Sequence, residues 1–475
     1  MSPIGTVAAE REAASARLDR LDDVLEERLD AHFPSLHAAA SAALGDAPDG
    51  GAQLAALTAA AVDAWRARTL DLRVHGEQRA ADPDRLRSRI TLGASCYADR
   101  FAGNLAGLRD EIPYLRDLGV TLLHVQSPFA EREDGTPDLR RIDPGLGSLA
   151  RLSDLAADLR LAGISLALEI SQAGDLVSFV TDALFLADHG VEVFLIGDPD
   201  TAAVLRAALA IAAPGVAVIA PSPGSAPLWE SLATGDAAPL RRALRWRSGS
   251  NGIAAVRDAD AVRWATDAAD LTAHYTRGSR GEAVDSGVAG TTASLAGLGD
   301  EDDLAEARIV LAHALALSVP GIPMLWLGDE VGQLNDPSHR DDPERRDDAR
   351  WLHRGQKPRD RYRQRTDATT PAGRLFAAIT KLIAVRRTTP EFDGSRLIGF
   401  DVTPSAVVAF QRPGPESTVL VLANVGTDAV TVDAVTLSGF DEDAEDLISG
   451  VPLDLSRGVE LEPCGIRWLR VSPRG

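Results

Sequence analysis

Short apolar segments alternate with helix-patterned segments through the middle of the chain, and this alternation restricts the possible folds more than any other feature. Each apolar segment is rich in Val, Ile, Leu and Ala, and a segment with apolar residues at helical spacing follows it. Seven of them can be placed as strands: Ser95–Tyr97, Thr121–Val125, Ile164–Ile170, Val191–Ile196, Val216–Ala220, Gly252–Val256 and Ile322–Leu327. Such strands, each followed by a helix, are typical of a parallel sheet that is buried on both faces.

The alternation predicts parallel strands, but it does not show whether the sheet closes into a barrel. About eight strand–helix units close into a (β/α)8 TIM barrel, and we expect this α/β fold here. The strand that should come sixth, near Leu228, has only a weak apolar pattern. A doubly wound open sheet would show the same alternation, so the periodicity alone does not decide between the two folds.

The two ends of the chain have different patterns, which divide it into three predicted domains. Residues 1–91 carry apolar residues at helical spacing and no convincing strand, which predicts an N-terminal helical domain. Residues 92–390 hold the alternation and form the predicted barrel. Residues 391–475 consist of short alternating segments between turn residues, which predict a C-terminal antiparallel β-sandwich.

The composition disfavours several classes of function. A net charge of -21 disfavours a phosphate-binding surface, so we expect no nucleic-acid partner. Cys96 and Cys464 lie far apart and no Cys/His cluster is present, so we expect no metal and no cofactor. Residues 1–11 lack the pattern of a secretory signal, and no window is apolar enough for a membrane span. The expectation is a cytoplasmic protein without a membrane partner.

Three stretches of the chain carry a specific sequence pattern. The first joins Cys96–Leu108 to Ile112–His124, the second is Gly290–Leu295, and the third joins Gly321–Asp336 to Asp347–Arg354. Together they resemble the amylosucrases of the α-amylase superfamily, which is glycoside hydrolase family thirteen. The order of a helical N-terminus, a barrel and a terminal β-domain also agrees with that family.

The resemblance implies a retaining enzyme that transfers glucose from sucrose to an α-1,4-glucan and releases fructose. A retaining mechanism needs two carboxyl groups about 5–5.5 Å apart, one as the nucleophile and the other as the acid. In this superfamily the nucleophile ends strand four, the acid ends strand five, and a third acid follows strand seven. Histidines beside the first and third groups hold the sugar hydroxyls.

Most of these positions lack the expected residue in this chain. Strand four has Leu195 and Gly197 where the family has an arginine and the nucleophilic aspartate. Asp198 comes one residue late, and such a shift turns a side chain to the other face of a strand. Strand five has Pro221 in place of the acid, and strand three ends at Gly174 in place of the histidine.

Two parts of the family's site remain in the sequence. Asp260 matches the third acid, although Ala259 and Ala261 replace its neighbours. Asp134 and Arg354 match an acid and an arginine that close the sucrose pocket, so we expect an ion pair between them. The tyrosine that should follow the acid and stack on the sugar is missing.

The candidate catalytic residues are therefore Asp198 and Asp260, and the candidate substrate-binding residues are Asp134 and Arg354. Each catalytic candidate has a structural alternative. Asp198 opens an Asp-Pro-Asp turn before a predicted helix, which favours a helix cap, and Asp260 is also an ordinary aspartate of an acidic chain. Asp329–Glu330, after strand eight, is expected to hold loop structure.

The sequence predicts an amylosucrase-like protein that is catalytically inactive and acts in binding or as a partner subunit. Its ligand would be sucrose or an α-glucan, or its partner would be a protein. One alternative is an active glucosyltransferase or α-glucosidase that uses carboxylates at shifted positions. Another is a glucan-binding module with exposed aromatic residues on the terminal domain, which the aromatic content of 5% disfavours.

Overall fold

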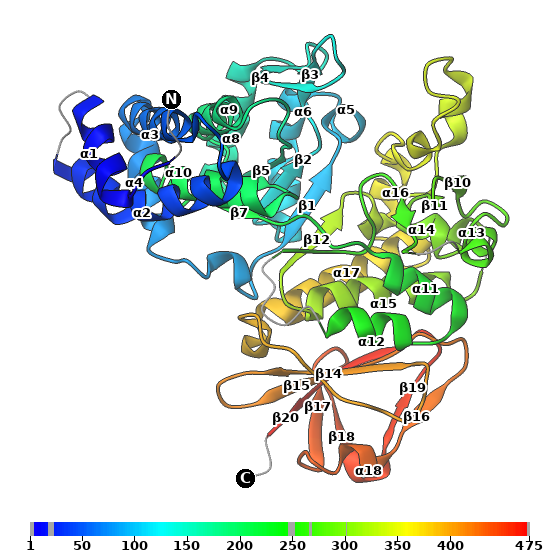
Figure 1. Cartoon of the computed structure of the whole chain (residues 1–475). Coiled ribbons are helices and arrows are strands. Elements are labelled where there is room, and N and C mark those ends of the chain that lie inside the picture. The colour runs from blue at the N-terminus through cyan, green and yellow to red at the C-terminus, as the bar shows by residue number, and fades with distance from the viewer. Residues whose placement is uncertain (1–3, 18–22, 246–251, 266–267, 301, 473–475) are drawn as a thin grey trace. The chain divides into compact units, whose positions relative to one another are not determined.

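The computed structural model describes residues 4–17, 23–245, 252–265, 268–300 and 302–472 (Figure 1). The chain folds into two compact units. The first unit consists of Met1–Arg85 and Cys96–Pro221, and the second of Leu86–Ser95 and Ser222–Gly475. The first unit thus groups the N-terminal helices with the first half of the predicted barrel, and the bounds of the three predicted domains stay a prediction.

The first unit contains parallel strands in the order β7–β6–β5–β2. They are β2 (Leu122–Val125), β5 (Ser165–Glu169), β6 (Val193–Leu195) and β7 (Ala217–Ile219), with α5 (Ala98–Phe101), α6 (Leu105–Asp110), α7 (Ile112–Leu118), α8 (Leu149–Leu161), α9 (Leu176–Asp188) and α10 (Pro199–Ala212) between or after them. A hairpin of β3 (Phe129–Glu131) and β4 (Pro137–Ile142) follows β2. All residues of β2 and β6 are buried, as expected for parallel strands that helices cover on both faces.

The N-terminal helices pack against this α/β region within the first unit. They are α1 (Val7–Arg17), α2 (Asp23–Leu44), α3 (Gly50–Ala67) and α4 (Leu70–Ala80), and both α2 and α3 contact α10. Arg28 donates to the carbonyl oxygens of Ala210 at 2.6 Å and Ile211 at 3.2 Å, where a cation also stabilises the end of a helix. His75 lies 3.0 Å from the buried carboxylate of Glu192, just before β6. The predicted N-terminal helices are therefore present and anchored.

The second unit contains three parallel strands in the order β1–β12–β8. They are β1 (Gly93–Cys96), β8 (Ile253–Ala255) and β12 (Ile322–Trp326), accompanied by α11 (Ala226–Thr234), α12 (Ala238–Leu244), α13 (Ala269–Tyr275), α14 (Thr292–Leu295), α15 (Ala305–Ser318), α16 (Arg359–Gln364) and α17 (Pro371–Arg387). A small antiparallel sheet has the order β10 (Glu282–Val284), β11 (Gly287–Ala289) and β9 (Val262–Arg263). Short 3-10 helices are η1 (Arg85–Arg87), η2 (Leu298–Asp300), η3 (Asp329–Val331), η4 (Pro337–Asp341), η5 (Ala349–His353), η6 (Pro390–Phe392) and η7 (Leu455–Arg457).

The weak sixth strand predicted near Leu228 is wrong. Leu228 lies in α11, and the described residues between β7 and β8 form only helices and loops. Leu228, Trp229 and Leu232 are the buried apolar residues of this segment. Their spacing of one and four residues places them on one face of a helix, which explains why the strand pattern was weak.

The C-terminal region is an antiparallel β-domain, as predicted. Its main sheet has the order β13 (Ile398–Gly399), β14 (Val407–Pro413), β15 (Thr418–Asn424), β20 (Ile466–Val471), β17 (Asp443–Asp446) and β18 (Val451–Asp454). β16 (Val430–Val432) pairs with β19 (Val459–Leu461), and α18 (Ala434–Leu437) lies between β16 and β17 in the chain. Leu420, Leu422 and Leu469 are fully buried in its core. Trp468 is also fully buried, so it offers no surface for stacking on a sugar.

Candidate functional site

The end of strand four, β6, carries no catalytic carboxylate in the family's position. Asp198 is exposed and forms the N-cap of α10, because its Oδ2 accepts a hydrogen bond from the backbone nitrogen of Thr201 at 2.7 Å. Hydrogen bonds from Thr201 lower the pKa of Asp198. The structural interpretation of Asp198 as a helix cap is confirmed. A carboxylate with this hydrogen bond stabilises the first turn of the helix.

The neighbouring strand ends of the first unit also lack the groups of a glycosidase. β7 ends at Ile219, and Pro221 follows it where the family has its acid. β5 leads to Gly174, which has a φ of +87°, a backbone conformation that glycine adopts without strain. A proline and a glycine carry no titratable side chain, so neither position supplies a proton donor.

Asp260 and Arg354 form an ion pair in the second unit. Arg354 Nη2 lies 2.5 Å from Asp260 Oδ1, and the two side chains are 18% and 40% exposed. Asp260 follows β8 and Arg354 follows η5, so the pair joins two segments that are 94 residues apart in sequence. The guanidinium of Arg354 also lies 5.1 Å from the ring centre of Trp351. The sequence picked out both residues but assigned Arg354 a different partner.

Asp134, the partner predicted for Arg354, lies in the turn of the β3–β4 hairpin of the first unit. Its Oδ1 accepts hydrogen bonds from the backbone nitrogen of Thr136 at 2.9 Å and from the Thr136 hydroxyl at 2.6 Å. These bonds lower the pKa of Asp134. The positions of the two units relative to one another are not determined, so the ion pair between Asp134 and Arg354 stays a prediction.

Buried cationic and aromatic groups lie beside the Asp260–Arg354 ion pair. The guanidinium of Arg257 lies 4.2 Å from the ring centre of Trp326, and Trp326 Nε1 donates to the Arg257 carbonyl oxygen at 3.2 Å. His353 is 4% exposed. Burial, together with the charges of Arg257 and Arg354, holds the pKa of His353 well below its usual value. This imidazole is therefore neutral at physiological pH and carries no positive charge there.

Asp258 is a carboxyl group that the sequence analysis did not single out. Its Oδ2 accepts hydrogen bonds from the backbone nitrogen of Ser225 at 3.2 Å and from the Ser225 hydroxyl at 3.3 Å. Burial raises the pKa of Asp258, although the bonds from Ser225 oppose the rise. The only signal in the sequence was its place two residues before Asp260, at the end of a barrel strand.

The second and third matched stretches contact each other in the second unit. The hydroxyl of Thr292 donates to Asp329 Oδ2 at 2.7 Å, and Asn335 Oδ1 accepts from the backbone nitrogen of Thr291 at 2.8 Å. Glu330 is fully buried and accepts from the Tyr362 hydroxyl at 2.7 Å. Asp329 and Glu330 therefore hold loops together, as the sequence analysis expected.

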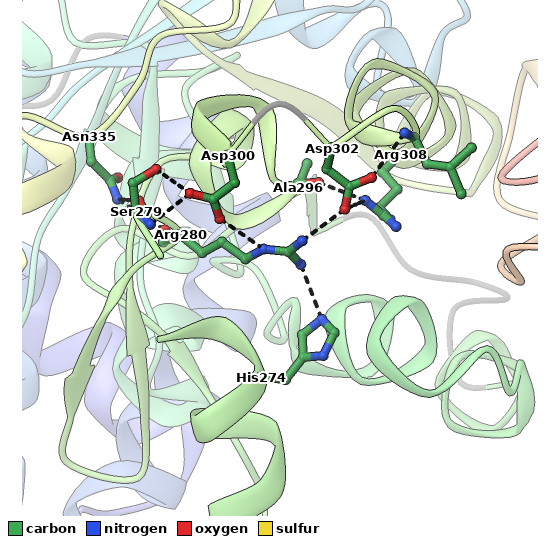
Figure 2. A network of polar contacts seen from close by, with 9 residues as sticks. His274, Ser279, Arg280, Ala296, Asp300, Asp302, Arg308 and Asn335 are labelled. Atoms are coloured by element: carbon green, nitrogen blue, oxygen red, sulfur yellow. Dashed lines mark hydrogen bonds and ion pairs between the residues drawn. The ribbon is translucent and has the colours of Figure 1, made fainter. Parts of the chain in front are cut away.

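A further polar network supports the same loops (Figure 2). Arg280 contacts the carboxylates of Asp300 at 3.4 Å and Asp302 at 2.8 Å, and Arg308 contacts Asp302 at 2.9 Å. Asn335 donates to the carbonyl oxygen of Arg280 at 3.0 Å. The sequence analysis singled out none of these charged residues, because the contacts of Arg280 join positions that are 20 and 22 residues apart in the chain.

In the ranges that the structure describes, no group of three or more His, Cys, Asp or Glu side chains is arranged to hold a metal ion. In the same ranges, no helix combines the length and the apolar character that a membrane crossing needs.

Comparisons with known proteins identify the fold. No family model matches the chain. A curated relative, the glucosylglycerate phosphorylase of Escherichia coli (strain K12), is 28% identical over 166 residues, which cover 34% of this chain and 28% of the relative. The amylopullulanase of Thermoanaerobacter thermohydrosulfuricus is 36% identical over 75 residues, 15% of this chain and 5% of the relative. The chain thus spans less than a third of the length of either relative.

Solved structures match over most of the chain. A variant of AmyP in complex with maltotriose has a TM-score of 0.61 at 12% identity, covering 86% of this chain and 99% of that chain. The α-amylase from Geobacillus thermoleovorans complexed with acarbose has a TM-score of 0.56 at 11% identity, covering 82% and 99%. These likenesses confirm the predicted barrel architecture with its C-terminal antiparallel domain. At these identities the likeness shows a shared architecture: the chain has the fold of these α-amylase structures.

Proposed function

We propose that this chain is a catalytically inactive, amylosucrase-like member of the superfamily that binds an α-glucoside without cleaving it. The observation that supports the proposal is that both candidate carboxylates are engaged in contacts within the protein. Asp198 caps a helix, and Asp260 is held by Arg354. Neither is left as the nucleophile that a retaining mechanism requires.

Loss of the acid supports inactivity independently of the nucleophile. The two carboxyl groups of a retaining site perform different steps, and removal of either one costs most of the rate enhancement. Pro221 stands where the acid is expected, and the preceding strand β7 contains only Ala217, Val218 and Ile219. A compensating acid would have to come from another element.

The Asp260–Arg354 ion pair supports binding. A fixed guanidinium and a fixed carboxylate together offer donors and acceptors to neighbouring hydroxyl groups at little entropic cost. Both side chains are partly exposed, and Asp260 follows barrel strand β8 in the chain; ligands of this architecture bind at the carboxyl ends of such strands. The solved neighbours include an AmyP variant with maltotriose and an α-amylase with acarbose. An α-glucoside is therefore the ligand class that we propose.

Titration calorimetry with sucrose and with maltose tests the binding claim. The wild-type chain should bind at least one of them, and Asp260→Asn and Arg354→Ala should each weaken binding by about tenfold. Asp341→Asn removes an exposed carboxylate that lies outside this pair and should leave the affinity unchanged. Unchanged affinity in the first two variants would refute the assigned site.

A second candidate function, glycoside cleavage by shifted carboxylates, is favoured by Asp258. Its raised pKa is the property of a general acid, and it follows the same strand as Asp260. The chain's relative is named a phosphorylase, so turnover should be measured with and without inorganic phosphate. Release of fructose, glucose or a glucose phosphate that Asp258→Asn abolishes would establish this second function in place of the first.

A further inference from the structure

An apolar cavity lies beside β8 in the second unit. Its volume is 360 Å³, within the range of about 300–1,000 Å³ that is usual for binding sites. Helices α11, α12 and α15, strand β8 and the loop before α11 form its wall. The described residues that line it are Ala, Leu, Val, Pro and Gly, with Ser222 and Ser225 as the polar ones. The cavity therefore suits an uncharged occupant with apolar side groups.

The strand beside this cavity has one edge without a neighbour. β8 ends the parallel group β1–β12–β8, and among the described residues it pairs with β12 alone. The sequence analysis expected a sixth strand before β8 in the chain, but the segment around Leu228 forms α11. A strand at the end of a sheet presents backbone N–H and C=O groups that can pair with a further strand.

The register of β8 identifies the backbone groups at its open edge. The backbone nitrogen of Ile322 in β12 donates to the Gly252 carbonyl oxygen at 3.0 Å. In a parallel ladder, every second residue of a strand bonds to the same neighbour, so Gly252 and Ala254 bond to β12. The N–H and C=O of Ala255 consequently point away from β12, and no other backbone group of the described residues bonds to them.

The cavity extends to this open edge. Ala254 and Ala255 both line it, although consecutive side chains of a strand point to opposite faces of the sheet. A cavity that touches both residues therefore extends around the edge of the strand. Ala255 is partly exposed, whereas Ile253 and Ala254 are buried, so an occupant of the cavity can reach the backbone N–H and C=O of Ala255.

These features together favour an extended peptide as the occupant. A peptide strand supplies both the acceptor and the donor that pair with Ala255, and strand addition to an open edge obtains its affinity from such main-chain bonds. The small side chains of Ala243, Ala312 and Ala316 leave the room for its side groups. Charged side groups are disfavoured, because burial of an unpaired charge is costly.

We propose that this cavity binds an extended segment of a partner protein, with small apolar side chains, and that this segment pairs with the open edge of β8. The inference goes beyond the proposed binding of an α-glucoside and does not depend on it, because the Asp260–Arg354 ion pair does not line the cavity. The partner segment adds the strand that the sequence of this chain does not supply around Leu228.

Calorimetry with an acetylated Val-Ala-Val-Ala amide, titrated into the full chain, tests the inference. The wild type should bind it, and an ester analogue, in which oxygen replaces each backbone N–H, should bind about tenfold more weakly because it has no donor for Ala255. Ala243→Phe and Ala316→Leu fill the cavity from two helices and should each weaken peptide binding by about tenfold or more. Arg242→Phe is the matched control, because Arg242 is exposed on α12 and does not line the cavity; circular dichroism establishes that all variants are folded.

Three results would overturn the inference. No binding of the peptide by the wild-type chain would refute it outright. Equal affinity for the peptide and its ester analogue would show an apolar cavity that accepts a ligand without strand pairing. Full affinity in folded Ala243→Phe and Ala316→Leu would place the peptide elsewhere. None of these results affects the proposed function, because binding of sucrose and maltose is measured separately.

Discussion

The strand ends of the first unit and those of the second carry different parts of the site that the sequence resemblance predicts. In the first unit, Asp198 is a helix cap and Pro221 stands in the place of the acid. In the second unit, Asp260 and Arg354 contact each other, and the matched loops are joined through Asp329 and its neighbours. The comparison teaches that the scaffold and the polar contacts of this fold do not depend on a catalytic carboxylate in the expected positions after β6 and β7.

The retained loops of the second unit should matter most for stability. Glu330 is fully buried and accepts hydrogen bonds from Tyr362 at 2.7 Å and from the Gly328 backbone nitrogen at 2.8 Å. Glu330→Ala leaves two buried donors unpaired and should lower the free energy of unfolding by about 4 kcal/mol. Urea unfolding measures this, with the exposed Glu344→Ala as the control that should stay near zero. Equal effects of the two variants would show that the matched loops are not structural.

The first unit should be sensitive to acid through a buried histidine of its matched stretch. Burial lowers the pKa of His124 to about 4, whereas an unfolded histidine has a pKa of about 6.5. A base with a depressed folded pKa loses stability as the pH falls below the unfolded value, so the loss occurs between about pH 6.5 and 4.

The expected size of this loss is about 3 kcal/mol between pH 7 and pH 4. Urea unfolding at the two pH values measures it, and His124→Asn should remove this part of the pH dependence because asparagine does not titrate. An unchanged pH dependence in His124→Asn would mean that the pKa of His124 is the same in the folded and the unfolded chain, which would contradict this prediction.

The smallest expected effect is at Asp198. Asp198→Ala removes the cap of α10 and should lower the Tm slightly, whereas Asp198→Asn keeps an acceptor for the Thr201 backbone nitrogen and should leave the Tm unchanged. Differential scanning calorimetry compares the two. Loss of an enzymatic activity in Asp198→Asn would instead identify a nucleophile and reverse the assignment for the first unit.

Local patterns predicted much of this structure. Continuous apolar runs marked the buried strands, and Asp-Pro-Asp marked the start of α10, because burial and capping depend on neighbours in sequence. The strand prediction around Leu228 was wrong, because a short apolar run fits a helix as well as a strand. Asp260 and Arg354 were each recognised, but their contact joins segments 94 residues apart, and no local pattern specifies such a pairing.

Burial of polar groups was the other part that the sequence did not predict. Asp258 and His353 owe their shifted pKa values to burial among elements that fold from distant parts of the second unit. On the protein surface, the same residue types would keep pKa values close to their ordinary ones. Spacing along the chain identifies a residue's element, whereas its electrostatic environment depends on what packs around it.

The central claim is that no side chain of this protein forms a covalent bond to a sugar. A fluorinated α-glucosyl fluoride traps the glycosyl-enzyme intermediate of a retaining enzyme, because fluorine slows the hydrolysis of that intermediate. Intact-protein mass spectrometry after incubation with this reagent tests the claim most directly. We expect the mass of the unmodified chain alone. A stoichiometric increase by one fluoroglucosyl group, located by peptide mapping on Asp198, Asp258 or Asp260, would contradict the account and establish a working retaining site.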